Sequence, residues 1–192
     1  FGIFPYTSSS SSNAGYACVG AGIPGSHVDR TVGIVKAYST CVGEGPFTAE
    51  WFGEEAEALR QAGAEYGAAT GRPRRVGPID LVATRYGVQI QGATEIALTK
   101  LDVLSYMKEI PVCVQYESHG QKTDEFPFTA VVDEAKPVFT TMPGWGCDIS
   151  GVRKWEDLPV EARNYVEYIE KAIGCRISYV SVGASRDEYI QR

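Results

Sequence analysis

The chain has 192 residues, with 18 Lys and Arg against 24 Asp and Glu, and its formal net charge is −6. Its 44% of hydrophobic and 22% of charged residues are typical of a globular protein, and the length suits one large domain or two small ones. No run approaches the roughly 20 apolar residues of a membrane span, which predicts a soluble chain without a membrane partner. The acidic balance argues against a protein that grips nucleic acid over a broad face, because phosphate contacts favour a basic excess.

The cysteine and histidine content predicts a cytoplasmic protein without a metal site. The cysteines are odd in number and form no C-x-x-C pair, whereas a secreted disulfide framework favours an even set and zinc favours close pairs. We therefore expect reduced thiols at Cys18, Cys41, Cys113, Cys147 and Cys175. Only His27 and His119 are available to a histidine-based mechanism, and we expect neither to be catalytic.

The first segment, residues 1–15, is an apolar stub followed by a Ser/Asn-rich loop, which is typical of a flexible linker. It is followed by GAGIPG at residues 20–25, which matches G-x-G-x-x-G after a short apolar run at residues 17–19. If that run is a strand, the glycines suit the phosphate loop of a Rossmann-type NAD or FAD oxidoreductase, with Glu44 at a suitable distance for the ribose. The run is short for such a strand, so a plain glycine-rich loop is the other interpretation.

The remaining elements follow from hydrophobic periodicity and from glycine and proline breaks. Helices are predicted over residues 26–38, 50–66, 80–89 and 155–173. Strands are predicted over residues 96–100, 110–116 and 177–182, with a hairpin turn at 118–121. Loops are predicted over 39–47 and 67–78, and short strands and loops over 122–150. This alternation, without an internal repeat, predicts an α/β fold: a mixed, mainly parallel sheet with flanking helices and an antiparallel hairpin region.

Three arginines lie close together in the loop over residues 67–78. Arg72, Arg74 and Arg75 repel one another unless an anion lies between them, and guanidinium forks suit carboxylates and phosphates. Flanking glycines and Pro73 favour a loop over a helix face. The segment is therefore either an anion-binding loop or a basic turn in water.

Lys100 and Asp102 follow a predicted strand in the pattern x-K-x-D. A carboxylate accepts from both N1–H and the exocyclic amine of guanine, whereas adenine presents an acceptor at N1, and a lysine stem can pack over the base. Leaving two such donors unpaired costs about 1–3 kcal/mol each, which is enough to select guanine. The alternative is a solvated Lys and Asp at a strand end.

The last predicted strand ends at Ser181, Val182 and Gly183. In open α/β sheets, ligands bind at the carboxyl ends of strands, and glycine allows a base to approach the backbone closely. Without a ligand, the same residues are simply a strand followed by a turn.

Together these motifs resemble the adenylosuccinate synthetase family. The segments that carry the resemblance are GIVKAYSTCVGEGPF (33–47), YGAATGRPRR (66–75), ALTKLDVL (97–104), MPGW (142–145) and VSVGASRDEYI (180–190). They occur in the family's order and cover nearly the whole chain. The resemblance implies part of a P-loop-NTPase-like fold and a GTP-dependent ligase, which joins aspartate to inosine monophosphate (IMP) and gives adenylosuccinate in purine nucleotide biosynthesis. It makes GAGIPG an ordinary loop.

The resemblance also implies roles for single residues. The aspartate-binding loop is implied to comprise Ala68, Ala69, Thr70, Gly71, Arg72, Pro73 and Arg74. Within it, Thr70 and Arg72 hold the carboxylates of aspartate, Arg72 also reaches the ribose of IMP, and Arg74 approaches GTP.

For the nucleotides, the implied guanine readers are Lys100, Leu101 and Asp102, with Ser181, Val182 and Gly183 closing over the base. Val42 is implied to contact IMP through its backbone, and Ser8 stands where the family has a threonine near the 5′-phosphate. The serine run thereby becomes a phosphate-side loop instead of a linker.

The chain also departs from the family pattern. It has Gly77-Pro78 where the family has Gly-Trp, Gly183-Ala184 where it has Gly-Pro, and Ala69 where threonine is common. These positions lie in loops and at strand ends, so they bear on local geometry and not on membership of the family.

The family's glycine-rich phosphate loop, catalytic Asp and catalytic His have no counterpart in the sequence, and neither histidine stands in a matching motif. We expect the C-terminal portion of a synthetase, with a nucleotide and aspartate-loop segment at 1–95 and a guanine-pocket segment at 96–192. The start at Phe1 without an initiator Met agrees with a cut through a larger fold.

The resemblance implies Mg²⁺ bound by residues outside this sequence, GTP as co-substrate, and a homodimer of the whole enzyme. A non-catalytic, truncated homologue that keeps nucleotide affinity is the alternative.

Overall fold

The computed structural model describes residues 2–7, 11–25 and 28–192. The elements of its first half are α1 (Gly15–Ala21), β1 (Val32–Lys36), β2 (Tyr38–Cys41), α2 (Gly53–Gly63), β3 (Arg75–Asp80), α3 (Leu81–Gln91) and β4 (Glu95–Thr99). The second half contains η2 (Asp102–Tyr106), β5 (Glu109–Ser118), β6 (Gln121–Thr123), α4 (Thr129–Val132), β7 (Lys136–Pro143), η3 (Trp155–Asp157), α5 (Val160–Ile173), β8 (Ile177–Ser181) and β9 (Tyr189–Gln191).

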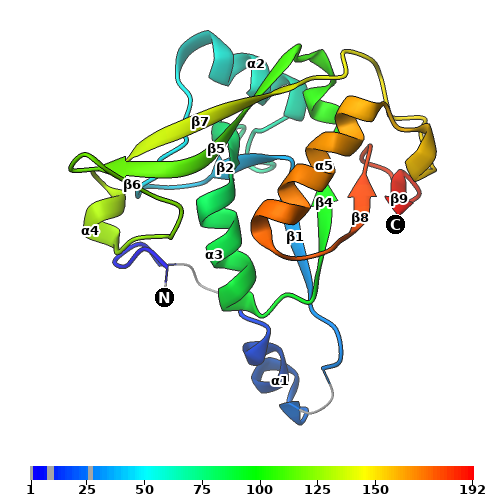
Figure 1. The fold of residues 1–192 in the computed structure, drawn as a ribbon. Helices are drawn as coiled ribbons and strands as arrows, with labels where there is room; N and C mark the ends of the chain where they lie inside the picture. Colours follow the sequence, from blue (N-terminus) through cyan, green and yellow to red (C-terminus); the bar gives the residue numbers. More distant parts are fainter. Residues whose placement is uncertain (1, 8–10, 26–27) are drawn as a thin grey trace.

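The strands form two sheets (Figure 1). The first has the order β1-β4-β8-β9, in which β1, β4 and β8 are parallel and β9 is antiparallel to β8. In the second, β2 is antiparallel to β3, β3 is parallel to β5, and β5 pairs with both β6 and β7 in antiparallel fashion. The predicted α/β class with an antiparallel hairpin region is confirmed.

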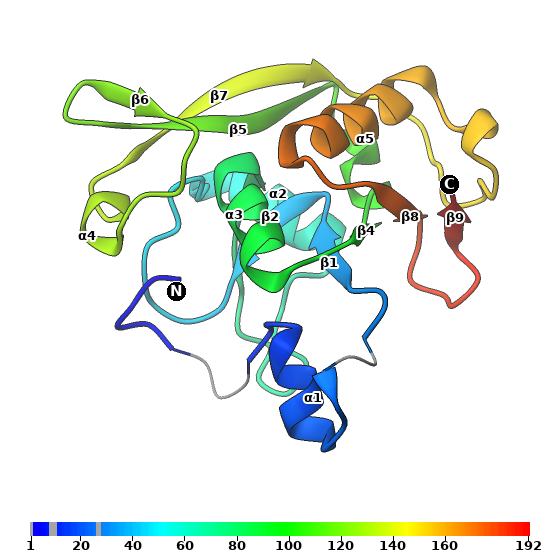
Figure 2. The ribbon, with the colours of Figure 1, turned by 60° about the horizontal axis from the view of Figure 1, so that its bottom comes forward.

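Helices α3 and α5 pack against each other and against the sheets (Figure 2). The buried face of α5 recurs every three or four residues, at Ala162, Tyr165, Val166, Ile169 and Ile173. These side chains belong to one core that also contains buried residues of the neighbouring strands β4 and β8. The core therefore fixes the positions of the strand ends where the candidate site lies.

Three predicted elements need correction. Residues 32–36, inside the predicted helix over 26–38, form the strand β1, because they pair along their length with β4 and this pairing overrides the helical spacing of the valines. Residues 38–41 form the strand β2, mostly within the predicted loop over 39–47. Residues 75–80 form β3, although residues 67–78 were predicted to be a loop and Asp80 was predicted to begin a helix. Residues 17–19 are helical, in α1, so GAGIPG does not follow a strand as a Rossmann phosphate loop does.

Other expectations agree with the structure within a few residues. Helices α2 and α3, strands β4, β5 and β8, and the turn between β5 and β6 lie where the sequence predicted them. The last helix begins only after Pro159, with a 3-10 turn before it. All five cysteines are free thiols, as expected. None of the helices in the described part of the chain combines the length and apolar character needed to cross a bilayer.

Candidate functional site

The candidate site lies at the carboxyl ends of β1, β4 and β8. Because these strands are parallel neighbours, their last residues meet at one edge of the sheet, where open α/β sheets bind ligands. The amide of Ala37, after β1, donates to the carbonyl of Thr99 at 2.8 Å, and the amide of Leu101, after β4, donates to the carbonyl of Ser181 at 3.2 Å. The structure thus brings the predicted guanine readers of both segments together.

Lys100 turns the chain from β4 into η2 with a left-handed backbone, at φ 60°. A non-glycine residue in this region costs about 1 kcal/mol, and such residues cluster at functional sites. Its ammonium donates to the carbonyl of Gly63 at 2.6 Å and lies 3.1 Å from Oε1 of Glu65. The head of the lysine is therefore tied down, and its aliphatic stem is the part left for contact with a base.

Asp102 begins η2 and is half-buried. Its Oδ1 is buried and accepts no hydrogen bond from any residue that the structure describes. Burial raises the pKa of this carboxyl above its usual value, although the nearby ammonium of Lys100 acts in the opposite direction. Buried carboxylate oxygens normally have donors, so an oxygen of this kind at a strand edge suits a ligand that brings its own N–H groups.

The end of β8 lies beside these residues. The hydroxyl of Ser181 donates to the carbonyl of Gly183 at 2.8 Å, and Val182 is fully buried. A Cβ on Gly183 would overlap the carboxylate of Glu188, so any larger residue here would require that side chain to move. Any part of Val182 in a site is limited to its backbone.

The predicted aspartate loop is a tight, closed turn. The amide of Gly71 donates to the carbonyl of Gly67, and the amide of Gly67 donates to the carbonyl of Arg72, both at 2.8 Å. Tyr66 and Pro73 form an isolated bridge below the turn. Within the turn, the hydroxyl of Thr70 accepts from the amide of Arg72 at 3.3 Å. The loop is therefore held at its base, and its tip is exposed.

The three arginines of this region differ in their ion-pair partners. Arg72 is exposed, and no side chain within the described ranges forms an ion pair with it. Arg74 pairs with Glu65 at 2.7 Å. Arg75 donates three hydrogen bonds to Glu50, between 2.5 and 2.9 Å. Of these three arginines, Arg72 is the one whose guanidinium has no ion-pair partner among the described residues.

The predicted IMP contacts lie partly outside the described residues. Val42 follows β2 and is 78% exposed. The next turn is held by Arg75, whose guanidinium donates to the carbonyls of Gly45 at 2.8 Å and Gly43 at 3.2 Å. Ser8 lies outside the described residues, so the structure gives its prediction no test. Arg75 thereby positions the segment that carries Val42.

This role of Arg75 leads to a first prediction. The Arg75→Met substitution should lower the free energy of unfolding by about 2 kcal/mol, because it leaves the half-buried Glu50 carboxylate without its donors. Amide hydrogen exchange at residues 42–45 should become faster at the same time. The control is Arg186→Met, at an exposed position. Equal denaturant midpoints for the two variants would contradict this prediction.

The central acidic residue of the site was not predicted from the sequence. Glu65 follows α2, and its side chain is fully buried. It accepts hydrogen bonds from Lys36, Tyr38 and Arg74 and forms an ion pair with Lys100. Burial opposes its charge, but these donors lower the pKa of its carboxyl to about 2. The only signal in the sequence was the position of this acid between Gly63 and Gly67, just before the loop that carries the arginines.

The comparisons with known proteins agree with this geometry. The family model described as adenylosuccinate synthetase matches residues 1–190. The chain belongs to the adenylosuccinate synthetase family. It is similar to the adenylosuccinate synthetases of Bifidobacterium adolescentis and Micrococcus luteus, with 50% identity over 191 residues in each case.

A solved structure, that of the fully ligated adenylosuccinate synthetase from Plasmodium falciparum, is similar over 100% of the chain. Its TM-score is 0.94, its sequence is 36% identical, and the match covers 46% of that structure. The match covers 99% of this chain but only 45% and 44% of the two bacterial synthetases. The chain therefore spans less than half the length of these relatives.

The resemblance to the family implies that the ligands of magnesium lie outside this sequence. Among residues 2–7, 11–25 and 28–192, no group of three or more His, Cys, Asp or Glu side chains is placed to hold a metal. No step below is therefore assigned to a metal bound by this chain.

Proposed function

We propose that this chain supplies the aspartate loop and the guanine pocket of a GTP-dependent synthetase that joins aspartate to IMP. Membership of the family supports the reaction class. The single observation that carries the guanine pocket is Asp102, whose Oδ1 is buried and accepts no hydrogen bond among the described residues. It lies two residues after a lysine whose ammonium is already held.

In this proposal, Asp102 accepts hydrogen bonds from N1–H and the exocyclic amine of guanine. Adenine offers an acceptor at N1, so it leaves the carboxylate unpaired at a cost of about 1–3 kcal/mol for each lost bond. The stem of Lys100 packs over the base, and the backbone from Ser181 to Gly183 forms the facing wall.

The aspartate substrate is assigned to the closed turn at residues 67–74. Arg72 has the free guanidinium that suits a carboxylate, and Thr70 orders the turn from within through the amide of Arg72. The backbone of Val42 is assigned to IMP, in a segment that Arg75 holds in place.

The proposed reaction transfers the γ-phosphoryl group of GTP to the 6-oxygen of IMP, after which the amine of aspartate displaces phosphate. The products are adenylosuccinate, GDP and phosphate. The residues of this chain contribute orientation and electrostatic stabilisation, which in enzymes lower barriers by several kcal/mol. The catalytic acid and base of the family have no counterpart among them.

A direct test is calorimetry of the 192-residue chain with GDP, with ADP as the matched control. We expect measurable binding of GDP and at least about tenfold weaker binding of ADP, since one lost buried hydrogen bond corresponds to that factor. Equal affinities for the two nucleotides would overturn the guanine pocket.

The same preparation should form no adenylosuccinate from GTP, IMP and aspartate, because it lacks the family's catalytic groups. Product is measured by its absorbance change. Turnover by the purified chain would overturn this prediction. The assay is then repeated after adding the N-terminal portion of a related synthetase. A chain that binds GDP but stays inactive in that mixture would favour a non-catalytic nucleotide-binding module.

A further inference from the structure

A single buried carboxylate joins the two proposed substrate sites. Glu65 is 0% exposed, and its four partners come from four different places in the fold: the end of β1, the start of β2, the end of the aspartate loop and the residue after β4. These partners are Lys36, Tyr38, Arg74 and Lys100.

The two oxygens of Glu65 are divided between the two sites. Oε2 accepts from Arg74 at 2.7 Å, at the end of the aspartate loop. Oε1 lies 3.1 Å from the ammonium of Lys100 and accepts from the hydroxyl of Tyr38 at 2.5 Å. Lys36 donates to both oxygens, at 2.9 and 3.1 Å. No other acidic group in the described residues forms an ion pair with Arg74 or Lys100.

The main chain of Glu65 adds a second connection to the loop. Its carbonyl accepts from the amide of Arg74 at 3.0 Å. Its own amide donates to the carbonyl of Arg60 at 2.9 Å, next to the left-handed Ala64 that ends α2. The carboxylate is therefore fixed by a helix end on one side and by the loop on the other.

The charges explain why this carboxylate matters. Three cations, those of Lys36, Arg74 and Lys100, surround one anion within 3.1 Å, and the group has an excess of positive charge. Burial lowers the pKa of Lys36, which is the direction expected for a crowded ammonium. Without the carboxylate, the three cations would repel one another and separate.

We propose that Glu65 is a positioning residue shared by the two substrate sites, which holds Arg74 for the aspartate loop and the ammonium of Lys100 for the guanine pocket. The roles of those two sites rest on the proposed function. Arg74 and Lys100 are both held by the carboxylate of Glu65. A movement of one cation therefore changes how firmly the other is held, which is a physical basis for coupling between the two substrate sites.

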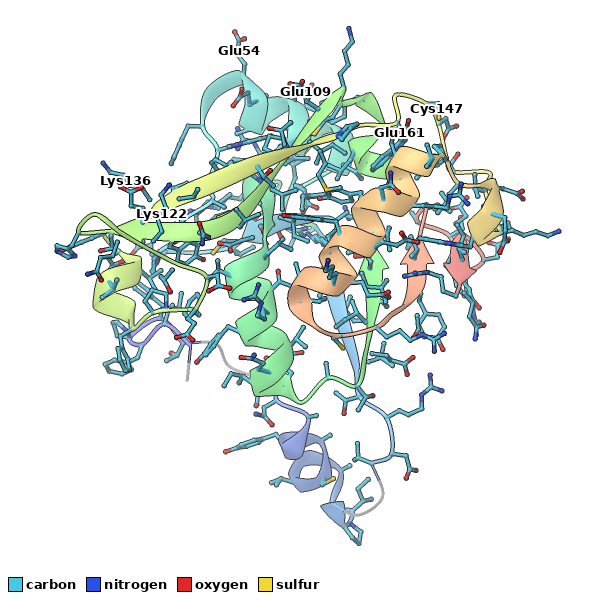
Figure 3. All side chains as sticks on the ribbon, in the orientation of Figure 1. Glu54, Glu109, Lys122, Lys136, Cys147 and Glu161 are labelled. Carbon is cyan, nitrogen blue, oxygen red and sulfur yellow. The ribbon has the colours of Figure 1, made fainter. Side chains whose placement is uncertain are left out.

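The test is the Glu65→Gln substitution, which keeps the shape of the side chain and removes its charge. Amide hydrogen exchange of the ligand-free chain is the first readout. We expect exchange at residues 67–74 and at residues 100–102 to become at least about tenfold faster, while exchange in α5 stays unchanged, since local opening and global unfolding are separate processes. The matched control is Glu54→Gln in the first turn of α2, whose side chain points outward in Figure 3.

Glu65→Asp is the second variant, in case the glutamine variant does not fold. It keeps the charge but is one methylene shorter, so it is unable to reach both cations at once. We expect intermediate exchange rates in the same two segments. Three outcomes would overturn the shared role. They are faster exchange in only one of the two segments, an equal increase throughout the chain, and unchanged exchange in both variants.

Binding of GDP is the second readout and separates this inference from the proposed function. We expect GDP to bind at least about tenfold more weakly to the Glu65→Gln variant than to the Glu54→Gln variant. If the unsubstituted chain binds no GDP, the proposed function fails, while the exchange experiment still decides whether Glu65 positions both segments. Unchanged GDP affinity in the Glu65→Gln variant would overturn its role at the guanine pocket.

Discussion

Asp102→Asn should make the ligand-free chain more stable and move its base preference from guanine toward xanthine. The buried Oδ1 of Asp102 accepts no hydrogen bond among the described residues, so a neutral amide removes an unfavourable charge. We expect a gain of about 1 kcal/mol in the free energy of unfolding at neutral pH, at the low end of the usual range because the side chain is only half-buried.

The change in base preference follows from the pattern of donors. Xanthine replaces the exocyclic amine of guanine with a carbonyl, which accepts from the side-chain N–H₂ group that the Asp102→Asn substitution introduces. Affinity for GDP should fall about tenfold to a hundredfold, and affinity for xanthosine diphosphate should rise. Calorimetry with both nucleotides measures this shift. An unchanged preference would show that Asp102 does not read the base.

The gain in stability should also depend on pH. Burial raises the pKa of Asp102 above its ordinary value of 3.8, so the folded chain binds the proton more tightly than the unfolded chain. The contribution of Asp102 to the stability of the unsubstituted chain therefore falls as pH rises from about 3.8 through the folded pKa. The advantage of Asp102→Asn should be full at neutral pH and should vanish below about pH 3.8. The exposed Asp187→Asn serves as the control, and a pH-independent advantage would contradict the stated cause.

Gly77→Ala should strongly destabilise the fold. A Cβ at this position of β3 would overlap the carbonyl of Ala49, which is backbone and unable to move aside like a flexible side chain. Ala49 is itself fully buried. We expect a loss of about 3 kcal/mol in the free energy of unfolding, measured by denaturant titration.

Gly87 provides the opposite case. It lies inside α3, and a Cβ there meets nothing within 4 Å. Gly87→Ala should therefore raise stability by about 0.5–1 kcal/mol, because alanine loses less backbone entropy in a helix. The two substitutions are chemically identical, so their difference isolates the steric environment. Similar denaturant midpoints for both variants would refute the packing assigned to Gly77.

Helices and strands were predicted correctly from the sequence where the local hydrophobic pattern agrees with the tertiary packing. The amphipathic spacing of α5 and the strands β4 and β8 were predicted because their periodicity matches their burial. The strand β1 was predicted to be helical, because its valines also suit a helix and only pairing with β4, more than 60 residues later, decides between the two. Pairing between strands so far apart in the chain cannot be recognised from the residues of β1 alone.

The residues of the candidate site that stand at strand ends were predictable from the sequence, and those that depend on distant partners were not. Lys100, Asp102 and Ser181 stand at strand ends, and parallel strands bring those ends together. Glu65 was missed, because its importance comes from partners 29 residues before it on β1 and 9 and 35 residues after it. The different states of Arg72, Arg74 and Arg75 were equally hidden, since Glu50 and Glu65 neutralise two of them from outside the loop.

Strand β1 has a consequence for every measurement on the chain alone. Among the described residues it pairs only with β4, and its Ile34 is 69% exposed and its Val32 40% exposed. An open row of backbone donors and acceptors with apolar side chains is a template that another strand can extend. Two copies joined along this edge would crowd Lys36, at the end of the same strand. Titrations at several protein concentrations therefore distinguish the affinity of a single chain from that of a self-associated one.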